Sequence, residues 1–477
     1  MGGPTVKARN PRTGEEDYAF EPSTGAQVGR DAEYLRAMQG EWEARGPACR
    51  ASVLRDFADA VEEASNDIVA ALGIDTGRGT IAKIEVQGLV ANLRRWATRG
   101  PELFDRLDRG PTASSVPAIE IESAYSPYPL LGVIAPWNFP VILSHIDAVP
   151  ALMAGSAALV KPSEVTPRFV GPMRDVLAQV PELPMRYVMG GPDVGEALIE
   201  NVDYVCFTGS TDTGRKVAGA AARRLIPANL ELGGKDPMIV AASADPRWAA
   251  KIALRASIVA TGQACQSIER VYVARSIAEP FIDALVAEAE RVALTHPDPA
   301  SGHLGPFIFA PQAAKVQAQI DDARSLGAKV LTGGQVERLD GGTYLKPTVL
   351  VDVTPQMAVM REETFGPVVP VTIFDDIEEA LSLTNDTRYG LSAAVLAGSN
   401  EEAAAIGARL EAGAISLQDG ALTSMVGDAA NTSRGASGLG PSRMGDSGML
   451  RFLRRQALIR QTGEPMPIDA YAERGSA

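Results

Sequence analysis

The chain has 477 residues, of which 45% are hydrophobic, and its 59 acidic and 45 basic residues give a net charge of -14. This length suggests about three structural units, each with enough apolar residues for a large core. The negative charge repels phosphate backbones and anionic lipids, so we expect neither nucleic acid nor a membrane as a partner.

Cysteine usage and the N-terminal composition favour a cytoplasmic protein. Cys49, Cys206 and Cys265 are too few, and odd in number, for a disulfide framework, which fits a reducing compartment. The N-terminal stretch MGGPTVKARNPRTGEED is polar and charged and lacks the apolar segment of a signal peptide. The most apolar stretch, residues 141–160, is interrupted by charged and helix-breaking residues, whereas a membrane span needs ~20 mostly apolar residues.

The first predicted elements are helices and an exposed strand. Residues 31–72 have helical spacing, with Leu54, Phe57, Val61 and Ala64 on one face, and predict a helical scaffold. Between residues 112 and 126, the alternation Ile-Glu-Ile-Glu at 119–122 predicts an exposed strand that can form part of a hairpin.

From residue 130 onward, short apolar runs alternate with amphipathic segments, which predicts a parallel sheet covered by helices. We expect strands over 130–135, 157–160, 187–189, 204–208 and 230–232. A second α/β unit follows Cys265, with strands over 271–273, 329–331 and 368–373 and a helix over 277–292. The tail RFLRRQALIRQ, from Arg451, can supply a strand for pairing with another subunit.

Two motifs place polar residues where predicted strands end. In APWNFP (135–140), Asn138 lies where a strand gives way to a helix, so its amide can either donate to an oxyanion or cap the helix. In LELGGK (230–235), Glu231 precedes paired glycines, which let backbone or a ligand come close. A carboxylate there belongs either to a structural ion pair or to a general base.

The motif GQAC (262–265) contains Cys265, which is either a buried inert thiol or a nucleophile. A nucleophilic thiol must lose its proton, and the usual acceptor, histidine, occurs only at positions 145, 296 and 303. None is close to Cys265 in sequence. The sequence therefore names no obvious base, although the fold can bring a distant histidine near.

Three further motifs also allow two interpretations. In KPSE (161–164), the two charges flank a helix start and can simply face solvent. FTGSTDTG (207–214) follows a strand and opens a helix, so Gly209 and Ser210 can bring backbone amides to a pyrophosphate or serve only as architecture. In EETFGP (362–367), Phe365 can pack into the core beside a turn at Gly366.

Together these six motifs resemble the NAD(P)-dependent aldehyde dehydrogenase superfamily, in its order and at similar spacings over almost the whole chain. The resemblance implies an aldehyde-dehydrogenase-like α/β fold and a homodimer or homotetramer. We expect a Rossmann-type dinucleotide-binding domain over 1–110 and 127–233 and an α/β catalytic domain over 234–450. A small oligomerisation element is expected over 111–126 and 451–477.

The resemblance also implies the catalytic roles. Cys265 would attack an aldehyde, and Asn138 with the Cys265 backbone N–H would form the oxyanion hole, each donor contributing roughly 2.7 to 4 kcal/mol. Hydride transfer to the nicotinamide leaves a thioester, and Glu231 would take the proton of the water that cleaves it. Glu231 also separates the chain from acylating relatives that pass the acyl group to coenzyme A. We expect no metal ion.

The cofactor roles come from the same resemblance. Lys161 would contact the adenosine ribose and Glu164 its hydroxyls; a carboxylate there repels a 2′-phosphate, which favours NAD over NADP. Glu363 would hold the nicotinamide ribose, and Phe365 would pack near the ring. The expected cofactor-binding residues are Trp137, Lys161, Glu164, Gly209, Ser210, Glu363 and Phe365.

The expected substrate contacts are apolar. If a helix begins near Asn138, Ile142 and Ile146 share a face with Phe139 and Leu143 alongside, and this wall suits an aromatic or long aliphatic aldehyde. The same side chains can instead pack the core. A semialdehyde dehydrogenase for carboxylated aldehydes, a cysteine hydrolase with a distant histidine and a noncatalytic homologue are the alternatives.

The end of the chain departs from the family. Ser-Leu-Gln-Asp at 416–419 and SRGASGLGPSRMG at 433–445 replace its usual segments, so no substrate name is transferred. Arg443, Arg451, Arg454 and Arg455 can attract an acidic substrate or form a solvated or subunit-facing cluster.

Overall fold

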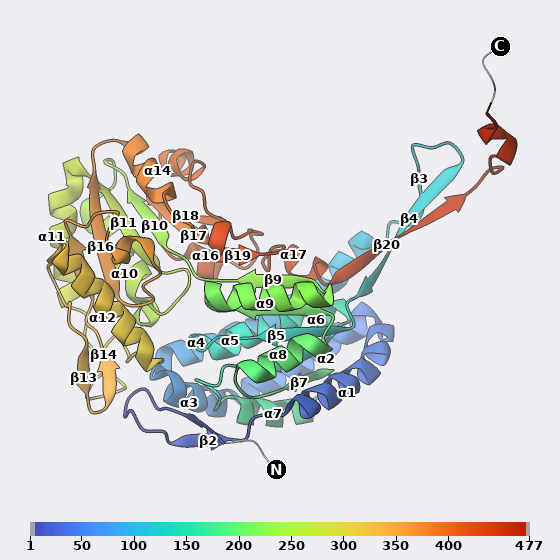
Figure 1. The fold of residues 1–477 in the computed structure, drawn as a ribbon, viewed down its shortest axis with the longest axis horizontal. Coiled ribbons are helices and arrows are strands. Elements are labelled where there is room, and N and C mark those ends of the chain that lie inside the picture. The colour runs from blue at the N-terminus through green and yellow to red at the C-terminus, as the bar shows by residue number, and fades with distance from the viewer. Residues whose placement is uncertain (1–4, 474–477) are drawn as a thin grey trace.

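Two mainly parallel β-sheets and a projecting arm form the computed structural model of the protein, which describes residues 5–473 (Figure 1). The first sheet contains, in spatial order, β19 (Gly438–Leu439), β9 (Ala228–Glu231), β8 (Tyr204–Thr208), β5 (Leu130–Ile134), β6 (Ala157–Lys161) and β7 (Met185–Tyr187). All its neighbours pair in parallel except β19 with β9. The order of the five parallel strands is that of a dinucleotide-binding sheet.

Helices cover both faces of the first sheet because each presents a buried apolar stripe to it. The covering helices are α1 (Gly25–Ala44), α2 (Gly46–Glu63), α3 (Ser65–Thr76), α4 (Gly79–Leu107), α6 (Ala148–Ala154), α7 (Val170–Gln179), α8 (Pro192–Asn201) and α9 (Thr211–Arg224). One core cluster contains residues of α2, α3, α4, α6 and α7, and another contains residues of α1, α8 and α9. The predicted scaffold over 31–72 is thus three helices, separated where Gly46 adopts a φ of +76° and at Ala64.

The second sheet contains, in spatial order, β12 (Lys329–Val330), β15 (Thr348–Val351), β16 (Val368–Phe374), β11 (Ile268–Ala274), β10 (Asp236–Val240), β17 (Ser392–Leu396) and β18 (Ala414–Leu417). Only β12 pairs antiparallel with its neighbour. Its larger helices are α10 (Pro246–Ile258), α11 (Ala278–Glu290), α12 (Ala310–Ser325), α14 (Ile377–Asn385) and α15 (Asn400–Gly407), joined by the short α13 (Ala358–Arg361) and α16 (Leu422–Met425). The expected α/β fold class is confirmed.

The predicted strands are present with shifted ends. The strand expected over 187–189 lies instead at Met185–Tyr187, because the chain turns at Gly190, whose φ is +149°. The chain passes from the first sheet to the second between Glu231 and Asp236, near the expected boundary at 234. Gly438–Leu439, which the expected division places in the catalytic domain, instead extends the first sheet through β9, and α17 (Ser447–Leu450) packs against α6.

The arm consists of β3 (Thr112–Ala113), β4 (Ile119–Pro127) and β20 (Leu453–Gln461), and it extends away from both sheets (Figure 1). The strand predicted in the tail is present, but it pairs antiparallel with β4 of its own chain, from Leu453 opposite Pro127 to Gln461 opposite Ile119. Smaller hairpins are β1 (Val6–Ala8) with β2 (Tyr18–Phe20) and β13 (Glu337–Leu339) with β14 (Gly342–Tyr344). Residues 1–4 and 474–477 of the expected domains lie outside the described residues. Within 5–473, no helix is both long and apolar enough to cross a bilayer.

Candidate active site

The site lies where the carboxyl ends of strands in the first sheet face the amino ends of strands in the second. Asn138 follows β5, Lys161 ends β6, Gly209 follows β8 and Glu231 ends β9. From the other side, Cys265 shortly precedes β11, and the segment 362–367 precedes β16. Open α/β sheets bind ligands at the carboxyl ends of their strands, so this meeting of edges is a natural place for a site.

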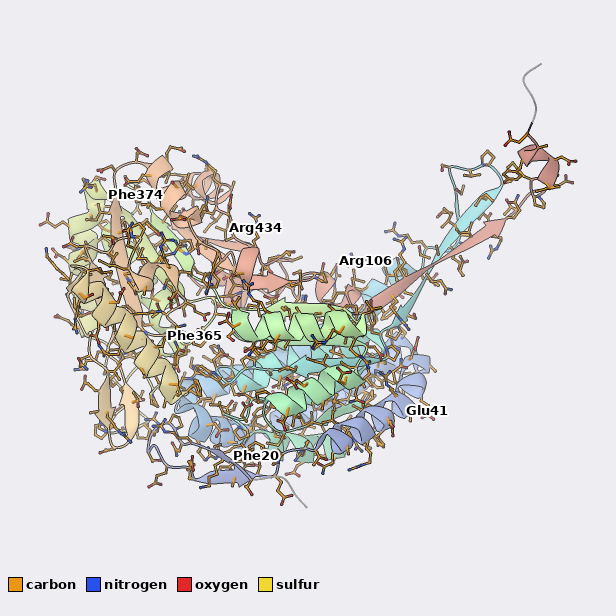
Figure 2. All side chains as sticks on the ribbon, in the orientation of Figure 1. Phe20, Glu41, Arg106, Phe365, Phe374 and Arg434 are labelled. Atoms are coloured by element: carbon orange, nitrogen blue, oxygen red, sulfur yellow. The ribbon has the colours of Figure 1, made fainter. Side chains whose placement is uncertain are left out.

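One cavity of about 1100 Å³ occupies this junction. It brings together all the predicted catalytic and cofactor-binding residues, whereas only one of the four predicted substrate residues lines it. Its lining includes Asn138, Glu231, Cys265, Trp137, Lys161, Glu164, Gly209, Ser210, Glu363, Phe365 and Leu143. In Figure 2, Phe365 lies between the part of the molecule that contains the first sheet and the part that contains the second.

A strained turn presents Cys265 to the cavity. Ala260, Thr261 and Gly262 all have left-handed backbones, with φ of 57°, 62° and 64°. Position 262 needs glycine for two reasons. Its backbone is left-handed, and a Cβ there would lie 2.4 Å from the carbonyl carbon of Gly366. Buried Gln263 fixes the turn by accepting a hydrogen bond from the Ile308 N–H at 3.0 Å. Such strain persists only where the surroundings impose it, as at functional sites.

The surroundings of Cys265 favour the protonated thiol. Burial, together with the nearby carboxyl groups of Asp236 and Glu363, raises the pKa of Cys265 to about 12. The side chain is only partly covered by the protein, so a reactant can reach it. At neutral pH the cofactor-free protein therefore holds an accessible but protonated thiol.

Asn138 is fixed by hydrogen bonding and does not cap a helix. α5 (Pro140–His145) begins two residues later and has no side-chain cap, whereas Asn138 Nδ2 donates to the backbone oxygen of Gln263 at 3.0 Å. This contact ties the amide to the turn that carries Cys265 and leaves Nδ2 a second hydrogen for another acceptor. The geometry is compatible with the oxyanion role, which stays a prediction.

Two buried charges that the sequence did not single out hold Asn138 in place. Arg78 donates to the backbone oxygens of Asn138 and, at 3.1 Å, of Ala260. Glu85 accepts from the Val141 N–H at 3.1 Å, and burial raises its pKa to about 7. The sequence could have pointed to these two residues, because Arg78 directly precedes α4 and Glu85 interrupts the apolar stripe of that helix.

Glu231 lies between Ser433 and Arg443. The Ser433 hydroxyl donates to Glu231 Oε2 at 3.0 Å, and Arg443 Nε lies 3.8 Å from Oε1. Glu231 is thus part of an ion pair and also lines the cavity, so its two sequence interpretations are not exclusive.

Arg443 and Arg451 are buried on Asp147, so they are neither solvated nor subunit-facing. Arg454 and Arg455 lie exposed on β20.

Glu363 and Phe365 are positioned by a buried ion pair. Glu269 accepts from the Thr364 N–H at 2.8 Å, from the Phe365 N–H at 2.7 Å and from Lys235 Nζ at 2.8 Å. These contacts hold Phe365 at a φ of 55°, which non-glycine residues rarely adopt. Glu363 accepts from the Gly234 N–H at 3.2 Å, and burial raises its pKa to about 7.

The residues along the first sheet fit a dinucleotide. Lys161 is buried and pairs with the more exposed Glu164 at 3.2 Å. Ser210 caps α9 by accepting from the Thr213 N–H. Ser210 and Thr213 both line the cavity, so the positive end of this helix faces it and favours an anion. The expectation for Gly209 needs correction, because its N–H already donates to the Glu231 carbonyl at 3.1 Å. Glycine is needed there because a Cβ would lie 2.6 Å from the Phe207 ring.

Aromatic residues line the cavity that contains Cys265. Trp137 meets Phe365 edge-on, with ring centroids 5.5 Å apart, and Phe309, absent from the sequence predictions, lies 5.9 Å from Trp137. Of the predicted substrate wall, Phe139 lies against Arg78, and Ile142 packs partly on the core of the first sheet. Ile146 is half-buried and does not line this cavity. Only Leu143 does, because the short α5 turns the other side chains away from it.

The three histidines do not support a cysteine hydrolase. His145 is buried between Val141 O and the Tyr187 hydroxyl, and burial lowers its pKa to about 4. His296 contacts Asp340, and His303 accepts from the Ala293 N–H. None lines the cavity that contains Cys265, so none is placed to take its proton.

One cavity at the junction of a dinucleotide-type sheet and a second α/β sheet is lined by a cysteine, an amide and a carboxylate, and this arrangement defines a class of nucleotide-dependent enzymes. The sequence model of the aldehyde dehydrogenase family matches residues 2–458. The chain therefore belongs to the aldehyde dehydrogenase family, and it is an NAD(P)-dependent enzyme of that family.

Known proteins resemble the chain over nearly its full length. A solved structure from Anabaena variabilis, provisionally named aldehyde dehydrogenase PutA, is 45% identical with a TM-score of 0.94, covering 97% of this chain and 99% of its own. Lactaldehyde dehydrogenase from Escherichia coli is 30% identical with a TM-score of 0.90, covering 96% of each chain. A Mycobacterium tuberculosis H37Rv protein, provisionally named NADP⁺ succinate-semialdehyde dehydrogenase 2, is 36% identical over 95% of this chain and 89% of its own.

Proposed function

We propose that the protein oxidises an aldehyde to the carboxylic acid with NAD, through a thioester on Cys265. The observation that carries the proposal is the single cavity that collects Cys265, Asn138 and Glu231 with the residues that fit a dinucleotide. Bound nicotinamide supplies the hydride acceptor. Overall, one aldehyde, one NAD⁺ and one water give the acid, NADH and a proton.

The residues divide this reaction into two halves. Cys265 loses its thiol proton, which is the proton released overall, and its sulfur bonds to the aldehyde carbon, while the Asn138 amide stabilises the oxyanion that forms. When the C–H bond breaks, its electron pair leaves with the hydride, and a thioester remains on Cys265. Glu231 then accepts a proton from water as the water oxygen attacks the thioester carbon, and the C–S bond breaks to release the acid.

The preference for NAD rests on Glu164. Its carboxylate pairs with Lys161 at the part of the cavity assigned to the adenosine ribose, so a 2′-phosphate would meet a negative charge. The M. tuberculosis relative carries NADP⁺ in its name, whereas a betaine aldehyde dehydrogenase from Staphylococcus aureus, 26% identical, is described in complex with NAD⁺. The ratio of kcat/KM with the two nicotinamides decides between them.

The proposed substrate is an apolar aldehyde, aromatic or long and aliphatic. Support comes from Leu143 and Phe309, two apolar residues that line the cavity. A carboxylated semialdehyde is the second candidate, because several relatives bear such names. The buried Arg443 is engaged by Asp147, so it offers no ready cation for the substrate carboxylate.

We also propose that the arm joins subunits into a homodimer or homotetramer. β20 is an edge strand, and its apolar residue Ile459 is exposed in the single chain. Exposed edges with apolar side chains favour pairing with another chain.

The variant Glu231→Gln tests the proposed division of labour. Acylation precedes the water step, so this variant should release one burst of NADH close to one per active site, followed by turnover at least about 100-fold slower than the parent. Rapid mixing with a good aldehyde and NAD measures both phases. Equal loss of the burst and of turnover would contradict a role for Glu231 that is confined to deacylation.

A further inference from the structure

Arg443 has a buried atom that lies close to the carboxylate of Glu231. The arginine side chain is 6% exposed, and its Nε atom is buried without a hydrogen-bond partner among the described residues. That atom lies 3.8 Å from Glu231 Oε1. Buried charged nitrogens are normally satisfied, so an unsatisfied one that lies beside a carboxylate points to a function involving that carboxylate.

Asp147 and Thr208 fix the position of Arg443. One terminal nitrogen of Arg443 donates to Asp147 Oδ2 at 2.8 Å and to Thr208 Oγ1 at 2.7 Å. Thr208 lies directly opposite Glu231 in the pairing of β8 with β9. The guanidinium group is therefore held against the strand end that carries Glu231.

The charges of this cluster balance only when Glu231 is included. Arg443 and Arg451 share the single carboxylate of Asp147, and all three side chains are at most 6% exposed. Burial alone would raise the pKa of Asp147, but the two arginines lower it below its ordinary value. Two cations on one anion leave one positive charge, which Glu231 is placed to compensate.

The segment that departs from the family supplies both contacts with Glu231. Ser433 and Arg443 flank β19, which pairs with β9 so that Gly438 lies opposite Glu231. The hydroxyl of Ser433 and the guanidinium of Arg443 thus approach the two oxygens of one carboxylate. Ser433 holds one oxygen by a hydrogen bond, and the positive charge of Arg443 attracts the other, so the two residues together favour one position of the carboxylate.

We propose that Arg443, anchored on Asp147, is a positioning residue that holds the Glu231 carboxylate with Ser433 in place for deacylation. This inference rests on the proposed role of Glu231. It predicts that loss of Arg443 slows the water step and spares the formation of the thioester.

The test compares Arg443→Met, Arg443→Lys and a control in NADH burst and steady-state experiments. Arg443→Met should keep its burst amplitude within about twofold and lose about tenfold or more in steady-state rate, and Arg443→Lys should recover most of that rate. The control Arg409→Met removes an exposed arginine that pairs with Glu378, and because neither residue lines the cavity, both phases should stay unchanged. Asp147 keeps Arg451 as a partner in Arg443→Met, so the variant should fold, which thermal unfolding checks.

A double variant shows whether Arg443 acts through Glu231. Adding Arg443→Met to Glu231→Gln should cost little further steady-state rate, since the group that Arg443 positions is already disabled. If Arg443→Met does not fold, Ser433→Ala and Arg443→Lys carry the test, and Ser433→Ala should lower the steady-state rate severalfold with its burst intact. Unchanged turnover in a folded Arg443→Met, or equal loss of both phases, overturns the inference. Full turnover in Glu231→Gln would instead overturn the role of Glu231 on which the inference rests, whereas a parent enzyme that forms no NADH from any aldehyde would overturn the proposed function itself.

Discussion

Cys265 carries the proposed chemistry in surroundings that keep its thiol protonated. Burial and the carboxyl groups of Asp236 and Glu363 all disfavour the thiolate. A reactive cysteine in this state is protected from adventitious oxidation and alkylation, because the thiolate is the reactive form. Any activation must therefore come with the reactants.

The pH dependence of alkylation tests this state directly. With a pKa of about 12, the thiolate fraction of Cys265 in the cofactor-free protein should rise about tenfold per pH unit from pH 7 to 10. The rate of iodoacetamide labelling of Cys265, followed by peptide mass spectrometry, should therefore rise without a plateau over this range. A plateau beginning below pH 9 would show that the resting thiol ionises much more readily.

The segment 362–367 illustrates how an element is positioned by one buried ion pair. It has no regular structure of its own between α13 and β16. Its shape depends on Glu269, which accepts from two of its backbone N–H groups and from Lys235. Both partners are almost fully buried, and burial lowers the pKa of Lys235.

Glu269→Gln should therefore destabilise the protein and weaken cofactor binding together. The variant leaves the buried charge of Lys235 without a counter-charge, which costs about 3 to 5 kcal/mol, and loosens the segment that carries Glu363 and Phe365. Urea unfolding measures the stability, and the KM for NAD should rise. The control Glu378→Gln breaks an exposed pair with Arg409 and should leave the stability nearly unchanged. Equal stability of the two variants would count against the structural role of Glu269.

The sequence predicted elements and motifs better than the contacts between distant residues. Short apolar runs located the five parallel strands of the first sheet but only β11, β12 and β16 of the second, where β10, β15, β17 and β18 were not predicted. Each motif lay next to a strand end that the fold then brought to the cavity. The pair of Arg443 with Asp147 spans 296 residues of sequence, and no local pattern announces it. The bond from the Gly209 N–H to the Glu231 carbonyl likewise depends on the pairing of two strands, which a turn motif does not specify.

At the scale of the whole molecule, strand ends of the two sheets face one another across the cavity, and an arm extends away from both sheets (Figure 1). The site depends on both sheets, because Asn138 and Glu231 come from the first sheet and Cys265 precedes a strand of the second. The arm contributes none of the residues that line the cavity. Its paired apolar residues, Ile459 opposite Ile121, are exposed in the single chain, which agrees with the proposed role in assembly.

Ile459→Asp tests the role of the arm. A charge on this exposed apolar position should weaken association, because burying an unpaired carboxylate in an interface is costly. Light scattering during size-exclusion chromatography should show a lower mass than for the parent. Gln456→Asp, on the opposite face of β20, is the control and should keep the parental mass. A parent protein that is already monomeric would contradict the proposed assembly.

The thioester on Cys265 is the central claim, and intact-peptide mass spectrometry of Glu231→Gln tests it most directly. After mixing with aldehyde and NAD and quenching in acid, the peptide that contains residues 262–265 should carry the mass of the acyl group. The same peptide should be unmodified when NAD is omitted, and no acyl peptide should form in Cys265→Ser. An NADH burst without any acylated Cys265 peptide would contradict the account.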